Sequence, residues 1–92
     1  MKFDSIEQQL AYEASLLSAI SVGDVYRHHK NQQLYTIIGF ARDSETLQLK
    51  VVYQAMYTTV FGQNSVWVRD LSMFLESVEY NGQIVPRFSK VS

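Results

Sequence analysis

Two consecutive runs of strand-forming residues, 34–42 and 47–57, constrain the fold more than any other part of the chain. Both runs are rich in β-branched and aromatic residues, which pack well on a pleated, half-buried surface. The connection between them reads Asp-Ser-Glu-Thr, and Asp and Ser side chains commonly bond their own turn backbone. The two runs therefore predict an antiparallel hairpin, around which the rest of the chain packs.

The pattern of the two arms predicts which face of the hairpin is buried. Because strand side chains alternate between faces, the predicted core face of the second arm holds Leu47, Leu49, Val51, Tyr53 and Ala55. The first arm is apolar on both faces, which is typical of a central strand that is covered on both sides. Gly39 inside this arm predicts a bulge or a bend.

A helix is predicted over residues 5–20. Ser5 and Gln8 fit the capping-box pattern at its start. An apolar stripe recurs at helical spacing and consists of Ile6, Leu10, Ala14, Leu17 and Ile20. We expect this stripe to cover one face of a β core, and the alternative is that it pairs with a second subunit.

Short strands and tight turns fill the rest of the chain. Strands are predicted at 24–30, 65–69, 77–80 and 83–85. A single helical turn capped by Asp70 is expected to bury Leu71 and Phe74, and Asn81-Gly82 is a strong hairpin signal. With no βαβ alternation, the chain predicts a mainly β fold. We expect a small antiparallel SH3-like barrel or a strongly bent sheet of about five to six strands, with an N-terminal helix.

Length and composition limit the class of protein. Ninety-two residues fit one domain, and we divide them into a helical extension, 1–22, and a small β-barrel domain, 23–92. The net charge of −1 argues against a general nucleic-acid binder. No cysteine is present, so disulfides and thiolate zinc sites are excluded. No run is apolar enough to span a membrane, no signal peptide is recognised, and we expect a cytoplasmic protein without a cofactor.

Several stretches together resemble one known family. They are Tyr26-Arg27-His28-x-Lys30, Ala41-Arg42-x-Ser44-Glu45-Thr46, Val51-Val52-Tyr53-Gln54-Ala55, Trp67-Val68-Arg69 and Met73-Phe74. In order and spacing the chain is similar, over roughly residues 23–88, to a small bacterial family known as domain of unknown function number sixteen fifty-three. The resemblance implies a small β-rich bacterial module and carries no activity, substrate or catalytic residue. His29, Asp43 and Asp70 depart from the family pattern.

Two sets of residues are candidates for a metal site or a catalytic site. Adjacent strand residues point to opposite faces, so we expect His28 and His29 not to share a metal ion, and no metal site is predicted. His28 together with Glu45 or Ser44 could act as an acid and base. Turn chemistry, in which Asp43 and Ser44 bond local amides, is the favoured explanation of this loop, although it accounts less well for Glu45.

A third set combines basic and aromatic side chains on strands that should be neighbours. Its members, the predicted ligand-binding residues, are Arg27, His28, Arg42, Glu45, Tyr53, Gln54, Trp67 and Arg69. If these side chains converge, guanidinium groups and flat rings form a shallow groove. Otherwise Trp67 and Tyr53 belong to the core and the arginines pair with nearby acids.

A non-enzymatic binding module is therefore the leading interpretation. Its ligand is a peptide, a single-stranded nucleic acid or a small anionic molecule. The alternatives are a small enzyme that uses His28 with Glu45 or Ser44, and a structural or assembly protein that forms a homodimer through residues 5–20.

Overall fold

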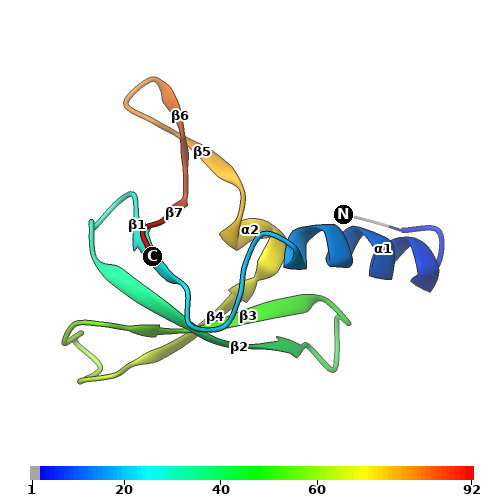
Figure 1. The fold of residues 1–92 in the computed structure, drawn as a ribbon, viewed down its shortest axis with the longest axis horizontal. Helices are drawn as coiled ribbons and strands as arrows, with labels where there is room; N and C mark the ends of the chain where they lie inside the picture. Colours follow the sequence, from blue (N-terminus) through cyan, green and yellow to red (C-terminus); the bar gives the residue numbers. More distant parts are fainter. Residues whose placement is uncertain (1–2) are drawn as a thin grey trace.

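The structure, a computed structural model, describes residues 3–92 (Figure 1). Its elements in chain order are α1 (Ile6–Leu17), β1 (Val25–His28), β2 (Leu34–Arg42), β3 (Leu49–Ala55), β4 (Val66–Asp70), α2 (Leu71–Phe74), β5 (Ser77–Tyr80), β6 (Gln83–Pro86) and β7 (Phe88–Lys90). The prediction of a mainly β chain with an N-terminal helix is confirmed. None of the helices in this described range is long and apolar enough to cross a bilayer.

Two antiparallel sheets make up the β part of the fold. Five strands pair in the order β4-β3-β2-β1-β7, and β5 pairs only with β6. The β5–β6 hairpin projects away from the larger sheet (Figure 1), with Asn81 and Gly82 at positive φ in its turn as the sequence predicts. Within residues 3–92 the backbone pairing closes no barrel, so the fold fits the strongly bent sheet.

The predicted bulge at Gly39 is present and explains why β2 is apolar on both faces. The pairing of β2 with β3 shifts register between Ile37 and Gly39. An extra residue in a strand reverses which side chains face the core, so Phe40 lies opposite Val51 and packs against the core as Ile37 does. The expectation that β2 is covered on both sides is wrong at Ile38, which is 41% exposed on the outer face.

Aromatic rings fill the core on the inner face of the sheet. The buried hydrophobic residues are Ile20, Tyr26, Tyr35, Ile37, Val51, Tyr53, Ala55, Leu71, Phe74 and Phe88. The helical turn α2 buries Leu71 and Phe74 as predicted. Asp70 does not cap α2, because its carboxylate bonds Lys50 instead. Strand β7 was not predicted, and it brings Phe88 into a parallel stack with Phe74, with ring centroids 3.9 Å apart.

The N-terminal helix differs from the prediction in the face that it buries. Ser5 caps α1 by accepting a hydrogen bond from the Gln8 amide, as expected. The apolar stripe does not cover the core, because Ile6, Leu10 and Leu17 are all exposed. Ile20, beyond the end of the helix, is the member of the stripe that is buried.

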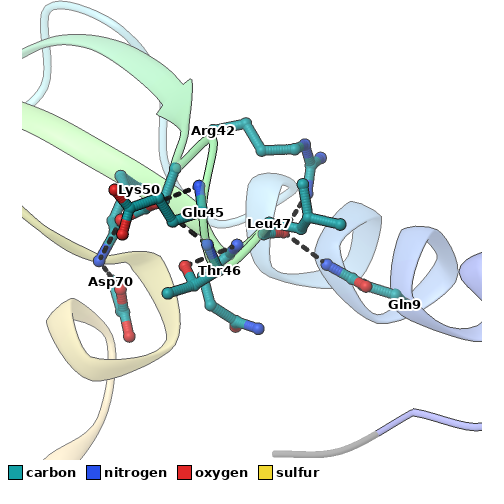
Figure 2. A network of polar contacts seen from close by, with 9 residues as sticks. Gln9, Arg42, Glu45, Thr46, Leu47, Lys50 and Asp70 are labelled. Carbon is teal, nitrogen blue, oxygen red and sulfur yellow. Dashed lines mark hydrogen bonds and ion pairs between the residues drawn. The ribbon is translucent and has the colours of Figure 1, made fainter.

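A polar network fixes α1 against the β2–β3 turn. Arg42 donates to both carboxylate oxygens of Glu13, at 3.0 and 2.9 Å. Arg42 and Gln9 also both donate to the Leu47 carbonyl, as Figure 2 shows. The hydrogen bonds from Arg42 lower the pKa of the buried Glu13 carboxyl. The helix meets the turn through this polar contact, and the apolar residues Ile6, Leu10 and Leu17, which lie within about 60° of Glu13 around the helix axis, stay exposed beside it.

Candidate functional site

One end of the inner sheet face opens into a small pocket between the β1–β2 turn and the edge strand β4. Its volume is about 220 Å³. It is lined by His28, Asn31, Tyr35, Tyr53, Tyr57, Trp67, Arg69 and Phe88, and we call it the tyrosine pocket. The β3–β4 register places Trp67 opposite Tyr53 and Arg69 opposite Val51. The side chains of Trp67 and Arg69 therefore lie on the same face of the sheet as the buried core residues, and they reach the pocket from the edge strand.

A hydroxyl network forms one wall of the tyrosine pocket. The phenol oxygens of Tyr35 and Tyr57 are 2.5 Å apart. The Asn31 amide donates to both, at 3.1 and 3.5 Å, and its own carbonyl accepts from the Gln33 backbone. The hydrogen bond with Tyr35, together with burial, raises the pKa of Tyr57 to about 12. Tyr57 is therefore neutral near pH 7, and the wall offers hydroxyl groups to a ligand.

Arg69 supplies the charge of the tyrosine pocket. Its Nε donates to the Tyr53 hydroxyl at 3.4 Å, and its guanidinium lies 5.7 Å from the centre of the Phe88 ring. Burial lowers the pKa of His28 to about 4, and the nearby charges of His29 and Arg69 contribute to the shift. His28 is thus neutral near pH 7, and among the described residues that line the pocket only Arg69 carries a charge.

Trp67 separates the tyrosine pocket from a shallower cavity along the same strand. That cavity, about 350 Å³, is lined by Phe61, Ser65, Val66 and Trp67. The Trp67 ring is 37% exposed and meets the Phe61 ring edge-on, with centroids 5.6 Å apart. Trp67 is therefore available to a ligand on both of its sides, whereas the ring of Tyr53 belongs to the core and contributes its hydroxyl.

The structure brings together half of the predicted ligand-binding residues. His28, Tyr53, Trp67 and Arg69 line the tyrosine pocket. Arg27, exposed on β1, instead lines a separate cavity of about 390 Å³ beneath the β5–β6 hairpin.

The other three predicted residues lie on different parts of the surface. Gln54 points to the outer face and donates to the Asn64 carbonyl at 3.2 Å. Arg42 and Glu45 lie at the β2–β3 turn (Figure 2), where Arg42 reaches Glu13 of α1. The expected convergence of these three side chains with the others in one groove is wrong, because alternation along β3 and the length of β2 separate them.

The acid–base pairing of His28 with Glu45 or Ser44 finds no support in the geometry. The His28 amide bonds the Gln33 carbonyl at the start of β2, whereas both loop residues follow the end of that strand. Nine residues of strand separate the two ends, which corresponds to roughly 25–30 Å. Asp43 uses its carboxylate to accept from the Glu45 and Thr46 amides, which is the turn chemistry that the sequence indicates.

The two histidines lie closer together than expected. β1 ends at His28, so His29 already belongs to the turn, and the two rings stack with centroids 5.0 Å apart. The expectation that they point to opposite faces is therefore wrong. His28 accepts a hydrogen bond from the Lys30 amide at Nδ1, and no third metal-ligating side chain joins them within residues 3–92.

Four residues of the tyrosine pocket were not predicted from sequence, namely Asn31, Tyr35, Tyr57 and Phe88. Tyr35 lies opposite Ala55 in the β2–β3 pairing, so it shares the core face with Tyr53. The alternation of Tyr53, Ala55 and Tyr57 could have indicated this wall. The position of Phe88 depends on the pairing of β7 with β1, for which the sequence gives no local signal.

A larger cavity, of about 470 Å³, lies between α1, the start of β3 and α2. Three carboxylates line it, and each is already engaged by a cation. Glu13 pairs with Arg42, Asp70 with Lys50 and Glu76 with Arg87. Its charge is therefore neutralised within the fold, and the tyrosine pocket is the better candidate for a ligand site.

Comparison with known proteins places the chain among relatives. A family model described as protein of unknown function (DUF1653) matches residues 24–90. The crystal structure of a DUF1653 protein from Bordetella bronchiseptica is similar to this chain, with 34% sequence identity and a TM-score of 0.68. That similarity covers 80% of this chain and 90% of the other. No curated protein matched the chain.

Proposed function

The chain belongs to the DUF1653 family, and we propose that it is a non-enzymatic binding module whose tyrosine pocket receives a single anionic group. The observation that carries this proposal is the position of Arg69, which among the described lining residues is the one cation beside aromatic rings and hydroxyl groups and meets no carboxylate. A guanidinium in such surroundings favours a carboxylate or phosphate partner. The Trp67 ring offers a flat surface for the rest of the ligand.

The distribution of the remaining arginines favours one anionic group over a nucleic-acid backbone. A single-stranded nucleic acid needs a line of cations along its path. Arg42 is paired with Glu13 and Arg87 with Glu76, and Arg27 lines another cavity. The pocket volume of about 220 Å³ also suits one ring-sized group better than a chain of bases.

Titration of the fluorescence of Trp67, the single tryptophan, tests this proposal. Benzoate, phenyl phosphate, adenosine monophosphate and acidic peptides serve as separate probes. We expect at least one anionic probe to change the emission, and the Arg69→Gln variant to lose most of the response. Arg27→Gln removes the same charge from a different surface and should respond as the unmodified chain does. An unresponsive Trp67 with every probe, or an equal response in the two variants, would contradict the proposal.

The division of the chain is also a proposal. We take residues 1–22 as an extension and residues 23–92 as the binding domain, and the first two residues lie outside the described range. The start of the family match at residue 24 supports this boundary. The relative from Bordetella bronchiseptica supports a bacterial origin.

A second candidate function, assembly of two copies through α1, rests on one observation. Ile6 and Leu10, one helical turn apart on α1, are 61% and 51% exposed. Packing of this helix against the same helix of a second copy would bury both side chains. Light scattering on the unmodified chain and on a variant with Ile6→Ser and Leu10→Ser tests this role. A monomeric mass for both proteins would remove it.

A further inference from the structure

The outer edge of β4 presents backbone groups without partners. The Ala55 amide donates to the Ser65 carbonyl at 2.9 Å, so these two residues form a hydrogen-bonded pair. Hydrogen-bonded and non-hydrogen-bonded pairs alternate along antiparallel strands. Trp67 and Arg69 are therefore the next residues of β4 whose backbone groups bond β3. The N–H and C=O groups of Val66 and Val68 therefore point away from β3. Within residues 3–92 no further strand pairs with this edge.

This edge also lacks the usual protection against another strand. Proline, lysine and bulges commonly blunt the edges of natural sheets. The exposed part of β4 instead reads Val66-Trp67-Val68, and the two valines are 55% and 61% exposed. An edge of this kind is a template for an extended chain.

The free edge runs directly beside the tyrosine pocket. A strand added to β4 would alternate its side chains between the two faces of the sheet. Side chains next to Trp67 and Arg69 would lie on the pocket face, and those next to Val66 and Val68 on the outer face. The pocket side would favour an acidic residue because of Arg69, and the outer side would favour aliphatic residues because of the valines.

We propose that β4 binds an extended peptide with alternating aliphatic and acidic residues, which pairs antiparallel with Val66 and Val68 and places one carboxylate on Arg69. This inference rests on the proposed function in its use of Arg69, and adds the main-chain pairing and the class of partner. A second copy of the chain fits less well. Antiparallel pairing of two β4 strands centred on Val68 sets Trp67 beside Arg69 and supplies no carboxylate there.

Synthetic peptides provide the first test on the full chain. The probe is a short acetylated and amidated peptide in which valine and glutamate alternate, and its affinity is measured from Trp67 emission. In the antiparallel arrangement the valine amides face β4 and the glutamate amides face away. We expect N-methylation of the valines to weaken binding about tenfold or more, and N-methylation of the glutamates to leave it unchanged. Equal effects of the two modifications would overturn the inference.

A protein variant separates the edge from the pocket. Val68→Pro removes an outward-facing N–H and leaves the β3–β4 hydrogen bonds in place, as edge strands tolerate. We expect it to bind the valine–glutamate peptide about tenfold more weakly and to bind benzoate as the unmodified chain does. Arg69→Gln should weaken both. The N-methylated peptides keep the test valid on the unmodified chain if Val68→Pro does not fold.

The remaining outcomes are also decisive. Peptide binding that is unchanged in Val68→Pro would mean that the pocket alone holds the ligand, and would overturn the edge pairing. Benzoate binding without peptide binding would overturn the inference and leave the proposed function standing. A dimer that forms without peptide and disappears in Val68→Pro would assign the edge to a second copy, and would also overturn it.

Discussion

The phenol oxygens of Tyr35 and Tyr57 lie 2.5 Å apart, one at the start of β2 and the other just beyond β3. Because β2 and β3 are antiparallel, the start of β2 and the end of β3 lie at the same end of the hairpin. The Asn31 amide, from the preceding turn, donates to both oxygens. The hydroxyl wall of the tyrosine pocket is thus a direct product of the hairpin that organises the chain.

This wall has a measurable titration. The hydrogen bond with Tyr35 raises the pKa of Tyr57 to about 12, so ionising Tyr57 breaks a favourable contact. Between the ordinary pKa of 10.0 and about 12, the unfolded chain has lost this proton while the folded chain keeps it. The free energy of unfolding therefore falls as the pH rises through that window. We expect Tyr57→Phe to remove the last tyrosinate absorbance step of the folded chain. Tyr80→Phe, on the projecting hairpin, should leave that step in place.

The lowered pKa of His28 predicts that the folded chain loses stability in mild acid. Burial lowers its folded pKa from 6.5 to about 4, so between these values the unfolded chain binds a proton that the folded chain does not. Stability from this group is present above the unfolded pKa and is lost as the pH falls towards the folded pKa. We expect unfolding by urea to show a fall of about 1 kcal/mol between pH 7 and pH 5, after allowance for solvent screening. A His28→Gln variant with the same pH dependence as the unmodified chain would contradict this.

The attachment of α1 depends on the contact between Glu13 and Arg42. Glu13→Gln removes the carboxylate that accepts both guanidinium hydrogen bonds. Backbone amides of α1 should then exchange with deuterium faster, while those of β2 and β3 should not change. Glu7→Gln, an exposed change on the same helix, serves as the control. Equal protection of α1 in the two variants would show that other contacts hold the helix.

The stack of Phe74 on Phe88 should be a main source of stability. The Phe74 side chain is fully buried, and its ring lies at 10° to that of Phe88. We expect Phe74→Ala to lower the free energy of unfolding by about 3–5 kcal/mol. Phe61→Ala, at a side chain that is 76% exposed, should change it by less than about 1 kcal/mol. Similar effects of the two changes in denaturant titrations would contradict the assignment of the core.

Local signals in the sequence predicted the elements of the fold well. The Asp43 turn, the Gly39 bulge, the Asn81-Gly82 hairpin and the cap at Ser5 each depend on residues close in sequence, and each is present. The sequence did not predict which face of α1 is buried. That face is decided by the contact between Glu13 and Arg42, which are far apart in the chain, and periodicity carries no information about such a contact.

The candidate site was only partly predictable for a related reason. Alternation along a single strand is enough to put Trp67 and Arg69 on one face, and the pairing of β4 with β3 shows that this is the face of Tyr53 and Val51. Tyr35 and Phe88 join them only through the pairing of β2 with β3 and of β7 with β1. Arg42 was grouped with the site by its residue type and its place on a neighbouring strand, although the length of β2 carries it to the other end of the sheet.

The proposal that the tyrosine pocket binds an anion is tested most directly by a nitrogen–proton correlation spectrum of the labelled chain during titration with benzoate. We expect the Arg69 Nε–H and Trp67 indole N–H signals to move together with backbone amides of β4, and the Arg27 and Arg42 Nε–H signals to stay in place. Shifts confined to the surfaces of Arg27 or Arg42, or no shifts at millimolar benzoate, would contradict the assignment of the tyrosine pocket as an anion-binding site.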